Sequence, residues 1–311
     1  MTPLSVQKSV VIQASLDRAY ASVRSFRDWV KWCSWLAIQP DCERHFLQDN
    51  GGFAWEGVVA GECRVEVVHE DGPRSLRLKI SRLQPWKWQG ELEFKFRDLG
   101  GGQGSELTWT IEGGLPYARL RDAERAAAEL RSEADLALAL LRSFVETGAA
   151  PCKLETPGRV LYPGGHYLGL RWKGAITEIP AAIPAAFGKL TDWMKDHRVA
   201  ALGPRALFCQ EWEVARGICE VTPAILVGKG TVKGRLPAGF ATFNVPPGRA
   251  ELVRLAGPYA FLPLAWSAAK ARVDALDLDP SSAAEPFEIY ENSPSKTPPG
   301  QLSTAVYVPV R

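Results

Sequence analysis

A carboxylate near the end of the chain is the side chain best placed to do chemistry. Glu288 lies between Phe287 and Ile289 in a run typical of an inner strand. Because side chains alternate along a strand, Glu288 points away from both neighbours and shares its face with Tyr290. A carboxylate among aromatic rings can pair with a cation or a hydrogen-bond donor, and burial raises its pKa towards neutrality, which suits acid–base catalysis. The alternative is an exposed strand glutamate in a surface ion pair.

The other candidate ligand contacts are aromatic. Flat rings stack on planar lipophilic molecules, and their quadrupole attracts cations. The predicted pocket wall comprises Trp172 and Tyr259 at the ends of two strands, Trp193 and Trp266 on two helices, and Phe208, Trp212 and Tyr290 in the sheet. Trp266 lies on the apolar stripe of its helix and Trp193 lies beside another such stripe, so a role in core packing stays open for both.

A duplicated pattern positions these residues. A strand, a helix and two further strands are predicted over 167–174, 179–194, 206–212 and 217–227, and again over 249–257, 263–276, 286–292 and 301–310. The repeat aligns Trp172 and Gly174 with Leu255 and Gly257, and it sets Phe208-Cys209 opposite Phe287-Glu288. Two such copies paired edge to edge give one antiparallel sheet with two helices on one face, and they predict a pocket where the copies meet.

The first half of the chain predicts a curved antiparallel meander closed by a helix. A strand over 5–12 and a short helix over 14–23 come before a turn that contains Trp29, Trp32 and Trp35. Between 42 and 111, five runs show the period-two alternation of strands. Apolar residues spaced by three and four then predict a helix from near Arg121 to Glu146. The aromatic inventory fits either a solid core or a lined cavity.

The length of 311 residues suits two domains of about 150 residues each. The segment 147–158 contains Gly148, Pro151 and Pro157 and is predicted to be a linker. The predicted domains are therefore 1–146 and 159–311, and the fold class is α+β.

Composition and charge exclude several classes. A hydrophobic content of 46% and a charged content of 23% describe a globular protein, and the formal net charge is only +2. Without a long basic run, direct nucleic-acid binding is not expected, although a protein partner is compatible with this balance. No segment approaches the ~20 apolar residues of a membrane span, and no leader pattern is present, so we expect a cytoplasmic protein without a membrane span.

Metal, cofactor and nucleophile motifs are missing from the sequence. The six cysteines include no Cys-x-x-Cys pair, and the four histidines lie far apart, so neither a metal site nor a cofactor is expected. The glycines of Gly100–Gly104 join two predicted strands, and no helix follows that could hold a phosphate. No serine lies in a Gly-x-Ser-x-Gly elbow, so a serine hydrolase of that type is not indicated.

Residues 5–146 resemble the START/polyketide-cyclase superfamily, also called SRPBCC. The motifs that carry this resemblance are Ala14-Ser-Leu-Asp-Arg-Ala-Tyr20, the turn Asp28-Trp29 to Trp35, and Trp55-Glu56-Gly57 followed by Gly61-Glu62. The resemblance implies a helix-grip fold, in which an antiparallel sheet wraps around a long C-terminal helix and a hydrophobic cavity. The family's functions range from lipid carriage to ring cyclisation, so the resemblance specifies a fold rather than a reaction.

Residues 159–311 resemble the GyrI-like small-molecule-binding domain, which is also the effector domain of multidrug-responsive transcription regulators. The motifs are Gly257-Pro-Tyr259 with Ala265-Trp266, Pro286-Phe-Glu-Ile-Tyr290, and Leu302-Ser-Thr304 with Tyr307-Val-Pro309. The family often has an acidic residue after this last threonine, whereas this chain has Ala305. That departure weakens any mechanism that needs two carboxylates in the pocket.

Three functions are open at this point. The resemblance implies a domain that binds a small lipophilic, aromatic or cationic molecule for sequestration or sensing, and the chain lacks the helix-turn-helix of the regulators. The second function is hydrolysis of a reactive xenobiotic, with Glu288 as the general base and the tryptophans holding the substrate. The third is a protein-inhibiting module that acts through its outer surface.

Overall fold

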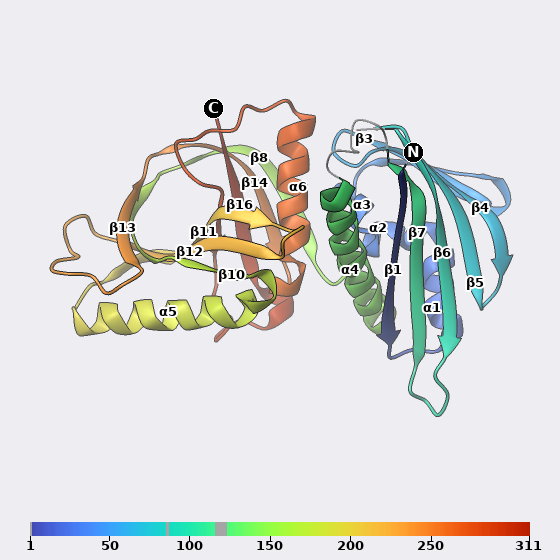
Figure 1. The fold of residues 1–311 in the computed structure, drawn as a ribbon, viewed down its shortest axis with the longest axis horizontal. Helices are drawn as coiled ribbons and strands as arrows, with labels where there is room; N and C mark the ends of the chain where they lie inside the picture. The colour runs from blue at the N-terminus through green and yellow to red at the C-terminus, as the bar shows by residue number, and fades with distance from the viewer. Residues whose placement is uncertain (1, 85–86, 116–122) are drawn as a thin grey trace. The chain divides into compact units, whose positions relative to one another are not determined.

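The computed structural model describes residues 2–84, 87–115 and 123–311. They form two compact units, Met1–Pro151 and Cys152–Arg311, each built on an antiparallel sheet (Figure 1). The predicted α+β class is therefore confirmed. No helix in the described part of the chain is both long and apolar enough to cross a bilayer.

The first unit contains one seven-stranded antiparallel sheet, in the order β1-β7-β6-β5-β4-β3-β2. Its strands are β1 (Thr2–Ile12), β2 (Glu43–Phe46), β3 (Gly52–Gly57), β4 (Gly61–Asp71), β5 (Ser75–Arg82), β6 (Trp88–Asp98) and β7 (Ser105–Leu115). Its helices are α1 (Leu16–Arg24), α2 (Trp29–Trp32), α3 (Ser34–Ala37) and α4 (Ala123–Thr147). The meander predicted from period-two alternation is present, and its last strand, β7, pairs with the first strand, β1.

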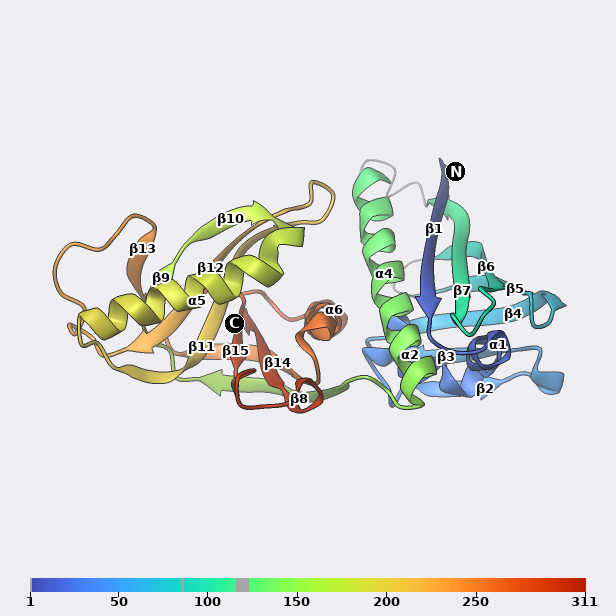
Figure 2. The same cartoon turned by 90° about the horizontal axis from the view of Figure 1, so that it is seen from below.

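The long helix α4 lies against β1 (Figure 2). Its buried side chains include Leu138, Leu141 and Val145, which are spaced by three and four as the sequence pattern predicts. The expected start near Arg121 lies outside the described residues. The helix ends at Gly148, whose φ of 78° suits glycine and whose N–H donates to the Phe144 carbonyl. The largest fully buried side chains of this unit include Trp29, Trp32, Trp55 and Trp109, so these tryptophans form packed core.

The second unit contains one nine-stranded antiparallel sheet. Its order is β13-β9-β12-β11-β15-β16-β14-β8, and β10 also pairs with β12. The strands are β8 (Lys153–Tyr162), β9 (Gly165–Leu170), β10 (Trp172–Ala175), β11 (Ala201–Glu213), β12 (Ile218–Val227), β13 (Phe240–Val245), β14 (Gly248–Ala256), β15 (Phe287–Tyr290) and β16 (Ser303–Val310). The helices are α5 (Ile179–Asp196) and α6 (Leu262–Ala275).

The predicted duplication is confirmed. The first copy consists of β9 and β10, α5, β11 and β12, and the second consists of β14, α6, β15 and β16. The copies meet where β11 pairs with β15, and Phe208 lies directly opposite Phe287 in that pairing. These two residues are also equivalent in the repeat, so the internal twofold relation passes through their pair.

The predicted linker is shortened by the structure. Residues 153–158 belong to β8, which pairs with β14, and only 148–152 connect the last helix of the first unit to this strand. Pro157 and Gly158 gave this stretch the composition of a linker. Both are accommodated because β8 is an edge strand and its pairing shifts register between Leu252 and Arg254.

Candidate functional site

Glu288 lies on an inner strand of the second unit, between Leu207 of β11 and Val306 of β16. Its alternation with Phe287 sends the carboxylate to the face of the sheet that α5 and α6 cover. Only 3% of the residue is exposed. The expected alternative, an exposed glutamate in a surface ion pair, is therefore wrong.

Both carboxylate oxygens of Glu288 accept hydrogen bonds from neutral donors. Trp266 of α6 donates from Nε1 to Oε2 at 2.9 Å, and the Tyr290 hydroxyl donates to Oε1. Burial raises the pKa of Glu288 above its usual value, and the hydrogen bonds from Tyr290 and Trp266 lower it, with burial the larger effect. No arginine, lysine or histidine among the described residues forms an ion pair with this carboxylate.

Aromatic rings surround the Glu288–Tyr290 pair. The Tyr259 ring packs edge-on against Tyr290 with centroids 5.4 Å apart, and Phe187 of α5 contacts Tyr290 at 5.9 Å. The Arg205 guanidinium lies 5.0 Å from the Phe187 ring centre. Burial, and then the charge of Glu288, raise the pKa values of Tyr290 and Tyr259. The resulting cluster joins α5, α6 and β15 where the two copies meet.

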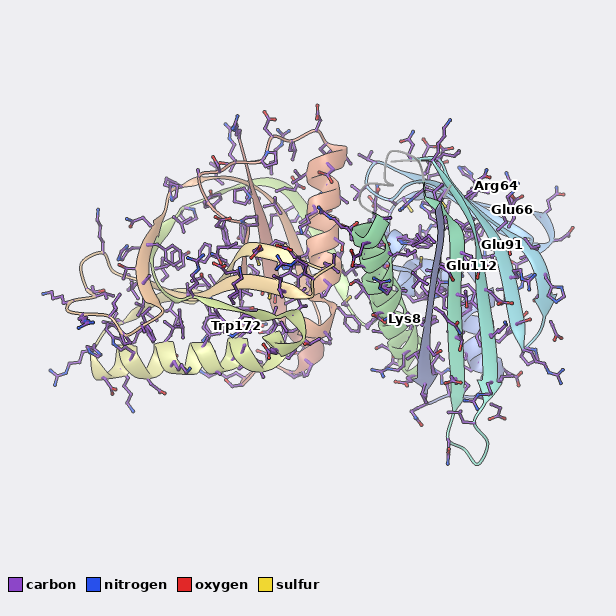
Figure 3. All side chains as sticks on the ribbon, in the orientation of Figure 1. Lys8, Arg64, Glu66, Glu91, Glu112 and Trp172 are labelled. Atoms are coloured by element: carbon purple, nitrogen blue, oxygen red, sulfur yellow. The ribbon has the colours of Figure 1, made fainter. Side chains whose placement is uncertain are left out.

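The structure brings four predicted site residues together, namely Glu288, Tyr290, Tyr259 and Trp266. Two others, Trp172 and Trp193, belong to the apolar core beneath α5. Trp193 is buried and stacks on His197 with centroids 4.0 Å apart. Trp172, labelled in Figure 3, lies on β10 and is half-buried. The core role that the sequence left open for Trp193 is therefore the one that the structure shows.

The remaining two expected site residues lie elsewhere. Phe208 shares a face with Phe287, which is opposite to the face of Glu288, and it packs on Tyr167 and Phe243 at 5.2 and 5.1 Å. Trp212, near the end of β11, is 42% exposed. The expectation that Phe208 lines the Glu288 pocket thus fails, because strand alternation separates the two side chains.

Three residues at the cluster were not singled out from the sequence. Phe187 is brought in by the packing of α5, Arg205 of β11 lies opposite Tyr290 in the sheet, and Cys209 lies on β11 at the position equivalent to Glu288 in the repeat. Burial raises the pKa of the Cys209 thiol well above its usual value, and the nearby Glu288 adds to that effect. The repeat alignment already paired Cys209 with Glu288, so that signal was available. Among the residues that the structure describes, no cluster of three His, Cys, Asp or Glu side chains could hold a metal ion.

No protein-family model matches the chain, and no curated protein matches it either. A search of solved structures matched an EcmrR–DNA complex, which is 14% identical over 62% of this chain and 68% of that chain, with a TM-score of 0.44. The EcmrR C-terminal domain is 16% identical over 51% of this chain and 98% of that one, with a TM-score of 0.39. Protein MLL2253 from Mesorhizobium loti is 14% identical over 45% of this chain and 96% of its own, with a TM-score of 0.36. Likenesses of this size establish neither a family nor an activity.

Proposed function

We propose that residues 159–311 form a GyrI-like domain that binds a small lipophilic, aromatic or cationic molecule beside Glu288. The observation that carries the proposal is the state of this carboxylate, which is buried and yet held only by the neutral donors Trp266 and Tyr290. The motifs around Tyr259, Trp266 and Tyr290 support the same assignment.

The electrostatics favour a cationic ligand. Removing an ionised carboxylate from water costs several kcal/mol, and neutral hydrogen bonds offset only part of that cost. A lipophilic cation would supply the missing positive charge and lose little hydration in doing so. The faces of Tyr259 and Tyr290 would add cation–π attraction.

The ligand enters, in this proposal, past the half-buried rings of Tyr259 and Trp266. Both rings lie on the second copy's helical side, in the segment 259–275. The Trp266 indole would leave Oε2 of Glu288 as the cation arrives, because a charge-assisted contact is stronger than the neutral hydrogen bond that it replaces.

A matched pair of ligands tests the proposal. N-methylquinolinium carries a permanent charge, and 1-methylnaphthalene has nearly the same shape without it. Glu288→Gln should weaken the cation's binding by about 1–3 kcal/mol, or roughly 5- to 150-fold, and leave the neutral ligand unchanged. Asp192→Asn removes one exposed negative charge from α5 and serves as the control. Equal losses for both ligands, or none for either, would contradict the proposal.

Hydrolysis is the second candidate, and the raised pKa of Glu288 is the observation that favours it. The carboxylate would accept a proton from water while the water oxygen attacks an electrophilic carbon and the carbon–oxygen bond to the leaving oxygen breaks. The protonated Glu288 would then return that proton to the leaving oxygen, which regenerates the carboxylate. Each oxygen of Glu288 already accepts one hydrogen bond, so a catalytic water would have to use a remaining lone pair among closely packed rings, and we therefore rank binding ahead of hydrolysis. Styrene oxide tests the alternative, since Glu288→Gln should reduce formation of its diol by about two to four orders of magnitude.

For the first half of the chain we propose a helix-grip domain of the START type. The meander order, the return of β1 to β7 and the packing of α4 on β1 support this assignment. The proposal is limited to the fold and includes no ligand, because the tryptophans that could have lined a cavity are packed in the core.

A further inference from the structure

A cavity of about 270 Å³ lies on the face of the second sheet opposite to Glu288. Its floor comes from β9, β11, β12 and the edge strand β13, and residues 282–285 form its rim. Phe208 and Thr222, a directly opposed pair of β11 and β12, are both on this face. The cavity is therefore separate from the Glu288 cluster, with the sheet between them.

One wall of the cavity is aromatic. Phe208 and Phe243 meet edge to face at 5.1 Å, and Tyr167 stacks on Phe243 at 5.8 Å. Gly169 of β9 lies between Thr222 and Phe243, and a Cβ atom there would come within 2.6 Å of Thr222 Cγ2 and 2.9 Å of Phe243 Cε1. A side chain at this position would push the wall apart, so glycine permits the close approach of Thr222 and Phe243.

Next to these rings, Gln210 and Thr222 present a donor and an acceptor side by side. Thr222 donates from Oγ1 to Oε1 of Gln210 at 3.2 Å, which orients the Gln210 amide. No described residue accepts a hydrogen bond from the Gln210 amide nitrogen, and the Thr222 oxygen keeps its lone pairs. Gln210 occupies this place because the β11–β12 pairing shifts register between Cys209 and Glu211. An adjacent donor and acceptor complement the C=O and N–H of a cis amide.

The charges around the cavity favour a neutral ligand. Arg171 is paired with Glu220, which also accepts from Lys173 at 3.2 Å. Glu285 lines the rim and has no ion-pair partner among the described residues. An anion would therefore meet an uncompensated carboxylate and a guanidinium that is already neutralised.

We propose that this cavity binds a neutral aromatic lactam or amide of one or two rings. A cavity of about 150 Å³ holds one benzene ring in a protein interior, so the larger volume here suits one or two rings. The ring lies against Phe208 and Phe243. Its carbonyl accepts from the Gln210 amide, and its N–H donates to Thr222.

Three small molecules test the ligand class by calorimetric or NMR titration of the full chain. The probe is 2-quinolone, a neutral bicyclic lactam. Quinoline keeps the rings but lacks the amide edge, and quinoline-2-carboxylate adds a negative charge. We expect one 2-quinolone per chain, with each analogue bound at least about fivefold more weakly, the scale of one or two neutral hydrogen bonds. Failure of 2-quinolone to bind, or equal binding of quinoline, overturns the proposal.

Variants locate the site. Ala241 pairs with Gly169 and faces the cavity, so Ala241→Leu should fill it and weaken 2-quinolone at least about tenfold. Thr242→Leu, on the next residue and the other face, is the matched control and should leave binding unchanged. Gln210→Leu should weaken 2-quinolone by about two- to tenfold without affecting quinoline. Unaltered binding by Ala241→Leu, or displacement of 2-quinolone by N-methylquinolinium, shows that the ligand sits elsewhere and overturns the assignment.

Discussion

The carboxylate of Glu288 is governed by its immediate surroundings. Burial raises its pKa, while the Tyr290 hydroxyl and the Trp266 indole lower it by bonding to the ionised form. None of the described basic residues forms an ion pair with it, and the effect of burial on the pKa is the larger one. Proton uptake and ligand uptake are consequently linked at this residue, because a cation prefers the ionised carboxylate and a neutral ligand is indifferent to its charge.

The pH dependence of stability follows from the same shift. The folded pKa of Glu288 is raised, so its favourable contribution is fully present below the unfolded pKa and is lost as pH rises through the folded pKa. Glu288→Gln cannot ionise and escapes this loss. Relative to the parent, the variant should gain about 1 kcal/mol or more in free energy of unfolding between pH 5 and pH 9, the scale of a desolvated polar group. Urea unfolding of both proteins at the two pH values measures the difference. A variant that loses stability relative to the parent between pH 5 and pH 9 would refute the prediction.

At the residue scale, the sequence predicts the contacts that follow from strand alternation alone. Glu288 and Tyr290 share a face because they are two residues apart on one strand, and this requires no knowledge of the tertiary structure. The Trp266 hydrogen bond depends on how far α6 is displaced along the sheet, which no local pattern specifies. The error on Phe208 was avoidable, since its alignment with Phe287 already put it on the face that Glu288 avoids.

At the element scale, α6 is held to the sheet by a buried ion pair. Arg272 donates from Nε to Glu251 of β14 at 2.5 Å, and Glu251 is fully buried. The second oxygen of Glu251 has no hydrogen-bond partner among the described residues. The hydrogen-bonding capacity of the pair is therefore only partly used, and its net contribution to stability depends on the presence of both charges.

Removing one member should be far more damaging than removing both. Arg272→Leu leaves the Glu251 charge buried and unpaired, and we expect it to lower the free energy of unfolding by about 3–5 kcal/mol. The double variant Glu251→Leu with Arg272→Leu removes the desolvated charges together and should recover most of that loss. Urea denaturation of the three proteins tests the cycle. Equal destabilisation by the single and double variants would mean that the side chains act through packing rather than charge.

The two edge strands of the second sheet show where element prediction from sequence stops. The sequence predicts a linker where the first six residues of β8, 153–158, are found, and it predicts no strand at β13. Each has a sheet partner on one side only, so its sequence need not carry the continuous apolar pattern of an inner strand. The inner strands β11, β12, β15 and β16 were predicted in order, because burial on both faces imposes that pattern.

At the scale of the whole molecule, the repeat made the second unit predictable. Each copy has its own alternation and its own apolar helix stripe, and pairing of β11 with β15 is the arrangement that lets two such copies share one sheet. Nothing comparable marks the boundary between the units. Its position depends on whether 153–158 finds a strand partner, and that partner, β14, lies about one hundred residues further along the chain.

Limited proteolysis tests the boundary. Elastase cuts after small residues, and the Ala149–Ala150 bond lies in the exposed connection between α4 and β8. Since 153–158 is hydrogen-bonded to β14, we expect an early cut within 148–152 and protection of 153–158. Both fragments should then show cooperative urea unfolding, because each unit carries its own sheet and core. A variant with Ala149→Asp and Ala150→Asp should resist cleavage there, because the small apolar pocket of elastase does not accept a carboxylate, and it serves as the control. Early cutting inside 153–158 would contradict the pairing of this segment with β14 and so the position of the boundary. Loss of cooperative unfolding in either fragment after a single cut would show that the two units do not fold independently.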